Sequence, residues 1–269
     1  MATRRPGNRN VQKILHEVPP PLRIGDFKTT SSAIHDIDFL GQFREWTTFG
    51  RAAQTYLAQI EWEGRDMTLL DRVDGELYSL KKEHVVVGNE TDLQGRFIQC
   101  IGHCVGALFR AQQIDLQFAS AQSAQRQYSL TPDSIMMDDG ATRKVVGELK
   151  VPWVERHSLE EAPKHEDRFR RVFGQIAQYM GDLNLKYGFM STYEETVFLK
   201  LESSGGPNSE TILYHSPVIL RDSRSSNTPG SESVTIRQAF FYLGCLANSG
   251  HRHAVIPRPG TTWVKVGKT

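Results

Sequence analysis

Two carboxylates and a lysine near the middle of the chain are the residues best suited to chemistry. Asp133 follows Pro132, and further along Glu148 and Lys150 are separated by a single residue. Carboxylate oxygens are the ligands that Mg²⁺ and Mn²⁺ prefer. Such an ion lowers the pKa of a bound water and neutralises charge at a scissile phosphate. A lysine beside it stabilises the negative charge of the transition state. The three residues therefore indicate metal-dependent hydrolysis of a phosphodiester.

The segment from Lys144 to Trp153 predicts a strand inside a sheet, because the residues around its central charges are almost all apolar. Side chains alternate along a strand, so Glu148 and Lys150 leave it on the same face. Burying both charges is costly unless a metal ion or a phosphate compensates them. The alternative is a surface salt bridge on an edge strand, worth at most about 1 kcal/mol.

A hairpin brings the first carboxylate to the second. Residues 128–137 predict a strand, and Asp138-Asp139-Gly140 predicts the tight turn that returns the chain to the next strand. Asp133 then lies alongside the strand that carries Glu148. The alternative for Asp133 is a strand-end residue that caps a turn.

A helix from about Arg168 to Tyr187 follows, ended by Gly188. Gln175 and Tyr179 stand four residues apart and share one helix face; the alternative is a simple hydrogen-bonded pair under the sheet. Arg168 and Arg171 lie near the N-terminal end of this helix, where its dipole also favours anions. We expect both to contact substrate phosphates, although the acidic residues nearby would cancel much of the field. Those are Glu155, Glu160, Glu161, Glu166 and Asp167.

These motifs resemble the PD-(D/E)XK nuclease superfamily. Pro132-Asp133 matches the first element, Glu148-Leu149-Lys150 the second, and Gln175 with Tyr179 the Q-x-x-x-Y motif of its RecB-like branch. The segments Gly147–Trp153 and Gly188–Tyr193 are similar to a nuclease-like domain of fungal proteins. The resemblance covers roughly residues 85–250.

The resemblance implies a restriction-endonuclease-like core and a Mg²⁺- or Mn²⁺-dependent nuclease acting on nucleic acid, with DNA as the first expectation. Asp133, Glu148 and Lys150 would be catalytic, and the two carboxylates would bind the metal together with the backbone carbonyl of Leu149. Gln175 and Tyr179 would lie beside the metal and orient the nucleic-acid backbone. Many members also place an acidic residue on the first core helix, where Glu90 and Asp92 are both candidates; Glu90 completes our predicted metal set.

The remaining elements predict an α+β (mixed α/β) fold, with a central mixed sheet flanked by helices and a helical N-terminal extension. Asn89 predicts the cap of a long helix over residues 91–113. A second hairpin is expected at 188–193 and 196–202, a strand at 211–220 and a last helix at 234–247. The predicted divisions are an irregular segment 1–30, a helical extension 31–84 with helices over 34–62 and 69–80, the nuclease-like domain 85–250 and a tail 251–269.

Composition restricts the other properties of the chain. It has 32 basic and 31 acidic residues, and a balanced total neither requires nor excludes nucleic-acid binding. Three cysteines are too few for a disulfide framework, and no apolar run approaches the ~20 residues that cross a bilayer. We expect an intracellular protein, cytoplasmic or nuclear, with no membrane partner.

Two other functions stay open on the sequence alone. The first is a catalytically inactive nuclease-like fold that binds nucleic acid or protein, which the near-neutral charge favours. The second is an enzyme that uses the same carboxylates and lysine on another substrate, because a fold does not determine its chemistry. Cys100, His103 and Cys104 also have a spacing that can hold a soft metal, but buried core cysteines are far commoner.

Overall fold

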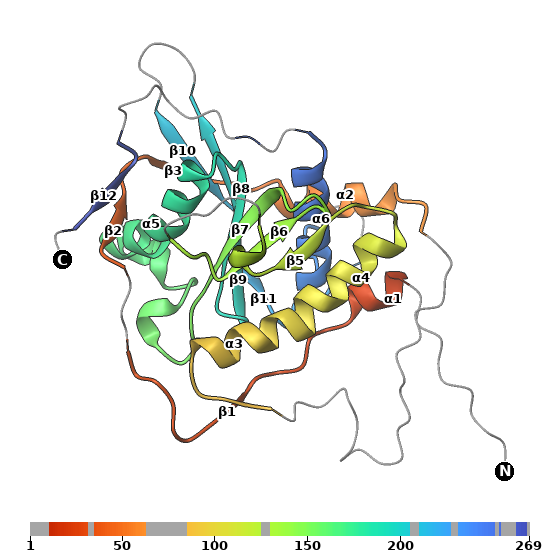
Figure 1. The fold of residues 1–269 in the computed structure, drawn as a ribbon, viewed down its shortest axis with the longest axis horizontal. Coiled ribbons are helices and arrows are strands. Elements are labelled where there is room, and N and C mark those ends of the chain that lie inside the picture. The colour runs from red at the N-terminus through yellow and green to blue at the C-terminus, as the bar shows by residue number, and fades with distance from the viewer. Residues whose placement is uncertain are drawn as a thin grey trace.

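The fold is built around one mixed sheet with helices on both faces (Figure 1). The computed structural model describes residues 11–31, 35–62, 85–124, 130–204, 210–226, 231–250, 253 and 262–267. Within these ranges the sheet has eight strands. They are β3 (Gln42–Glu45), β5 (Gln117–Ala119), β6 (Ser134–Met137), β7 (Arg143–Leu149), β8 (Tyr187–Ser191), β9 (Glu195–Ser203), β10 (Thr211–His215) and β11 (Ile219–Leu220).

The strands lie in the order β3-β10-β9-β8-β7-β6-β5, with β11 beside β9. β7 is antiparallel to β6 and parallel to β8. A parallel pair needs a long crossover, and α5 (Glu166–Asp182) lies on this connection. The hairpins β6–β7 and β8–β9 form as predicted. The prediction of a mixed α/β fold with a central mixed sheet flanked by helices is confirmed.

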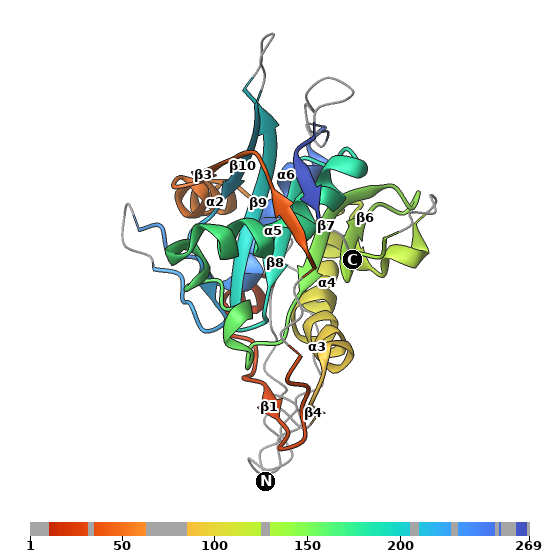
Figure 2. The same ribbon diagram turned by 90° about the vertical axis from the view of Figure 1, so that its left-hand side faces the viewer.

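Two hydrophobic cores lie on opposite faces of the sheet. α5 covers one face, and four other helices contribute to the core on the other (Figures 1 and 2). The predicted long helix is present, with a π-helical turn at Ile98–Gly102, and Asn89 caps it by accepting a hydrogen bond from the amide of Asp92. The four helices are α1 (Val11–His16), α2 (Phe49–Ala58), α3 (Glu90–Phe97) with its continuation α4 (His103–Ala111), and α6 (Ile236–Asn248).

Two small sheets flank the main one. β1 (Arg23–Ile24) pairs in parallel with β4 (Val86–Val87). β2 (Ile37–Phe39) pairs antiparallel with β12 (Val264–Val266) and packs against α5. None of the described helices is long and apolar enough to cross a membrane.

The N-terminal helical prediction is wrong for part of its length. Residues 37–39 and 42–45 are the strands β2 and β3, and only residues 49–58 are helical. β3 pairs with β10 and forms the edge of the main sheet, so this part of the predicted extension belongs to that sheet. The helix predicted over 69–80 and most of the C-terminal tail lie outside the described residues.

Two further boundaries differ from the prediction. α5 ends at Asp182, before Asn184 with its positive φ of 53°, and Gly188 belongs to β8. The strand predicted over 211–220 is divided into β10 and β11 around Pro217, which has no backbone N–H for the ladder.

Candidate metal centre

Three carboxylates converge at the end of β7. Glu148 lies on β7 itself, Asp133 directly precedes β6, and Glu90 is the first residue of α3. The β6–β7 register pairs Ser134 with Gly147, which brings Asp133 alongside the Glu148 segment. Each carboxylate offers one oxygen, and the three oxygens lie within 4.8 Å of one another. The structure therefore brings the three predicted carboxylates together.

Hydrogen bonds fix the orientation of Asp133. Its Oδ2 accepts from the Leu149 amide at 2.8 Å, and its Oδ1 accepts from the Gln94 side chain at 2.6 Å. Gln94 was not predicted, although it stands four residues after Glu90 and therefore shares its helix face. Asp133 therefore bridges two elements rather than capping a turn. The expected role of the Leu149 carbonyl as a metal ligand stays a prediction.

Lys150 lies among the acids. Its Nζ is 2.6 Å from Glu148 Oε1 and 3.5 Å from Glu90 Oε2. Glu148 is 2% exposed and Lys150 5%, and β7 lies between β6 and β8. The salt bridge is thus buried in a central strand, and the surface pair considered as the alternative is not what forms.

The charges of this cluster are out of balance, because one lysine faces three carboxylates. Burial, followed by the charge of Asp133, raises the pKa of Glu148 to about 8 despite Lys150. Burial also raises the pKa of Asp133 to about 6, against the lowering effect of the Leu149 amide. Burial alone would lower the pKa of Lys150, but the charges of Glu148 and Glu90 raise it to about 12. A further positive charge would lower the pKa of both acids and so favour their ionised forms.

The donor set fits a hard divalent cation. Glu148 Oε2 is buried and has no hydrogen-bond partner. A buried carboxylate oxygen left without a partner is costly. Oxygen ligands from one or more carboxylates are what Mg²⁺ and Mn²⁺ use in proteins. Glu90, Asp133 and Glu148 are accordingly the residues that could hold such an ion.

Gln175 and Tyr179 lie on α5 beside the cluster. Gln175 Nε2 donates to the Tyr179 hydroxyl at 2.5 Å, so the hydrogen-bonded pair that we considered does form. Burial and the charge of Glu148 raise the pKa of Tyr179 to about 12, so the phenol lies within electrostatic reach of the carboxylate. The pair therefore borders the candidate centre.

The two predicted phosphate-binding arginines already have partners. Arg168 donates to the backbone carbonyls of Glu155 and Ser158 and so holds the turn after β7. Arg171 lies 3.6 Å from Asp38 and 3.7 Å from Asp36, next to β2. Substrate contacts by these arginines stay predictions.

A cavity of about 380 Å³ adjoins the cluster. His157, which sequence reasoning missed, is buried at its edge. Its Nδ1 lies 3.0 Å from the Val151 carbonyl, which can only accept, so Nδ1 donates and Nε2 is left without a partner. Burial lowers the pKa of His157, which favours the neutral ring. The cavity is lined by Thr29, Ser31, His35, Asn89, Glu90, Thr91, Lys150, Val151 and His157.

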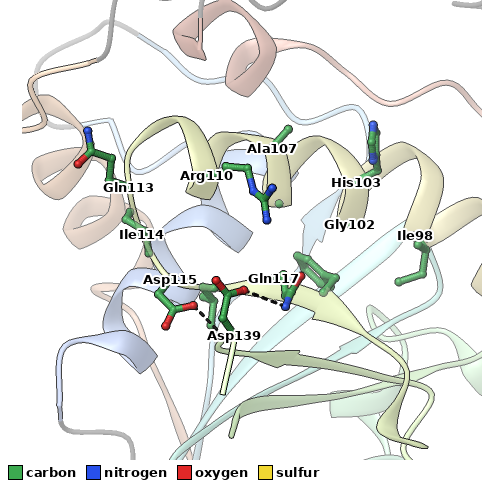
Figure 3. Close-up of a pocket in the computed structure, with 13 residues that line it drawn as sticks. Ile98, Gly102, His103, Ala107, Arg110, Gln113, Ile114, Asp115, Gln117 and Asp139 are labelled. Carbon is green, nitrogen blue, oxygen red and sulfur yellow. Dashed lines mark hydrogen bonds between the residues drawn. The ribbon is translucent and has the colours of Figure 1, made fainter. Parts of the chain in front are cut away.

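A larger cavity, of about 810 Å³, lies between α4 and β5 (Figure 3). On its strand side the side-chain amide of Gln117 donates to the Asp139 carboxylate, and the backbone amide of Asp139 donates to the Asp115 carboxylate. His103 and Arg110 lie on its helix side. None of the residues predicted for the nuclease site lines this cavity, so this larger cavity and the charged cluster are in different places.

Comparison with known proteins adds no relative. No family model, no curated protein and no solved structure matches the chain.

Proposed function

We propose that the protein is a Mg²⁺- or Mn²⁺-dependent nuclease of the PD-(D/E)XK type, which hydrolyses phosphodiester bonds in nucleic acid, with DNA as the first substrate to test. One observation carries the proposal. The buried Glu148 has an oxygen without a partner, and its carboxylate meets those of Asp133 and Glu90 beside Lys150. A purely structural ion pair has no use for two additional acids.

Asp133, Glu148 and Glu90 would hold the ion. When bound, Mg²⁺ or Mn²⁺ supplies activation of a water and neutralises charge at the scissile phosphate. The Leu149 amide and Gln94 hold Asp133 in place before the ion arrives, so little reorganisation is needed.

Lys150 supplies the positive charge that the protein itself brings to the reaction. Its ammonium is buried and stays protonated at neutral pH, because the neighbouring acids raise its pKa to about 12. A donor fixed in this way can orient the attacking water and stabilise the extra negative charge on the phosphate. Gln175 and Tyr179 would orient the nucleic-acid backbone from α5.

The test is cleavage of single- and double-stranded DNA with Mg²⁺ or Mn²⁺ by the wild type and by Glu148→Gln. The substitution keeps the shape of the side chain but removes the charge that would hold the ion. We expect metal-dependent cleavage by the wild type and a loss of at least about 100-fold in the variant. Asp138→Asn, in the same hairpin, is the matched control. Full activity of Glu148→Gln would refute the assignment.

A second candidate is an inactive nuclease-like module that binds nucleic acid or protein. The near-neutral charge keeps it open, because an active nuclease usually shows a clear basic track for its substrate and the basic and acidic residues here almost balance. Salt-dependent binding of DNA without any turnover, at saturating Mn²⁺, would support this candidate against the nuclease.

A further inference from the structure

An exposed aromatic residue stands near the candidate centre. Phe27 is 98% exposed. Ile24 in β1, Val86 in its partner β4 and the adjoining Val85 are 40%, 47% and 49% exposed. Exposed apolar groups gathered in this way mark binding surfaces in soluble proteins.

The segment that carries Phe27, here called the β1 arm (residues 23–29), is held in place. Figure 2 shows β1 and β4 extending beyond the start of α3. The Gly25 amide donates to Val87 at 3.0 Å, and the Thr29 amide donates to Gly88 at 2.8 Å. The Trp153 indole donates to the Thr29 carbonyl at 2.8 Å. The arm is therefore anchored at both ends.

The β1 arm lies next to the carboxylate cluster of Glu90, Asp133 and Glu148. Gly88, its partner, is two residues before Glu90 in the chain, and a Cβ added at Gly88 would lie 2.9 Å from the Phe27 carbonyl oxygen. Thr29, at the end of the arm, lines the same cavity as Glu90 and Lys150. A strand of nucleic acid with a phosphate at the cluster would pass close to this arm.

The arm also carries positive charge. Arg23 and Lys28 are exposed on either side of Phe27, and neither makes an ion pair with any residue that the structure describes. Asp26 is the one acid of the arm, so its net charge is positive. Cations beside an exposed aromatic ring are the combination that binds single-stranded nucleic acid, with phosphates at the cations and bases stacked on the ring.

We propose that the β1 arm binds the nucleic-acid strand next to the scissile phosphate, with Phe27 stacked on an unpaired base. Arg23 and Lys28 contact the phosphates on either side. Stacking needs a base whose face is free, and in a duplex both faces are covered by neighbouring bases. The substrate is therefore single-stranded nucleic acid, or a duplex with a single-stranded segment. This inference rests on the proposed nuclease function.

The test measures binding and cleavage separately. Fluorescence anisotropy in EDTA gives the Kd for a single-stranded oligonucleotide and for the duplex of the same sequence. We expect Phe27→Ala to weaken single-strand binding about tenfold and to leave duplex binding within about twofold. Phe27→Trp should retain the affinity, and Phe27→Leu, which is apolar without an aromatic face, should behave as Phe27→Ala. Lys28→Ala should reduce the slope of log Kd against log salt concentration by about one, which corresponds to the loss of one phosphate contact.

The results separate the two proposals. Because Phe27 is exposed, its variants should keep Tm within about 2 °C of the wild type. If Phe27→Ala and Phe27→Leu bind single strands as the wild type does, or if single-strand and duplex binding weaken equally, the β1 arm does not stack a base. If the wild type binds single strands through Phe27 but never cleaves them with Mn²⁺, the nuclease proposal fails and the proposed binding by the β1 arm is retained. If the wild type cleaves single strands and the Phe27 variants cleave them equally well at substrate concentrations below Kd, only the proposal for the β1 arm fails.

Discussion

Two ion pairs, each with a buried lysine, lie towards opposite ends of the strand β7. At one end Lys144 Nζ lies 2.8 Å from Asp138 Oδ2, and at the other Lys150 Nζ lies 2.6 Å from Glu148 Oε1. Both lysines are about 5% exposed. By residue type and distance the two pairs are nearly the same.

The surroundings of the two carboxylates differ. The second oxygen of Asp138 accepts from the Thr142 amide, while that of Glu148 has no partner. Burial opposes ionisation of Asp138, but the hydrogen bonds from Lys144 and Thr142 hold its pKa below the ordinary value. Burial and Asp133 raise the pKa of Glu148. One pair is complete by itself, and the other leaves a carboxylate oxygen without a partner among additional acids, where the proposed cation would bind. A salt bridge alone thus does not indicate function; an excess of acids around it does.

Exchanging each lysine for an uncharged residue of similar length should give the largest difference between the two pairs. Lys150→Met should lower kcat at least about 100-fold, because it removes the donor that we propose stabilises charge on the substrate phosphate. Lys144→Met should change kcat by less than about threefold and act on stability instead. Single-turnover cleavage with Mn²⁺ measures both, and similar kcat losses in the two variants would contradict the division.

Removing each carboxylate charge should affect the free energy of unfolding differently. Asp138→Asn leaves Lys144 buried without its counter-charge and should lower the free energy of unfolding by about 1–3 kcal/mol. Glu148→Gln removes a charge from an overcrowded acidic site, so in EDTA at pH 8 it should keep or raise that free energy. Urea denaturation of both variants gives the signs, and destabilisation by both would show that Glu148 is an ordinary structural partner.

The dependence of stability on pH should distinguish the same two acids. The pKa of Glu148 rises from its ordinary 4.5 to about 8 on folding. Its contribution to the free energy of unfolding is therefore fully present below about pH 4.5 and is lost as pH rises through 8. The lowered pKa of Asp138 has the opposite sign: its contribution is present above the ordinary value of 3.8 and is lost as pH falls. In EDTA, Tm of the wild type should therefore decline relative to Glu148→Gln between pH 5 and 8. Mn²⁺ should raise Tm more at pH 8 than at pH 5.

The smallest effect is expected on α5. Tyr179→Phe removes the acceptor of the Gln175 hydrogen bond and should cost about 1 kcal/mol of stability. If the pair orients substrate, KM should rise a few-fold with kcat nearly constant. An unchanged KM would assign the pair to packing under the sheet.

The local part of the site could be predicted from the sequence. Alternation along β7 places Glu148 and Lys150 on one face, and the Asp138–Gly140 turn aligns Asp133 with them. The apolar neighbours of Glu148 correctly indicated a central strand. These conclusions depend on residues near one another in the chain, where strand periodicity and turn chemistry decide the structure.

Several parts that depend on distant contacts were missed or wrong, although Glu90 was included in the predicted metal set. Ile37, Leu40 and Phe43 have helical spacing, but β3 exists because it pairs with β10, far along the chain. Gly41 marks this contact, since a Cβ there would lie 2.2 Å from the Thr211 carbonyl oxygen. Gln94 and His157 reach the centre only through the tertiary fold.

In the proposed nuclease, Asp133, Glu148 and Glu90 form one cation site. The most direct measurement is anomalous diffraction from crystals soaked in Mn²⁺. We predict one strong peak in contact with the Asp133 and Glu148 carboxylates, absent in Glu148→Gln. Saturating Mn²⁺ with no peak between these residues, or the same peak in the variant, would contradict the account.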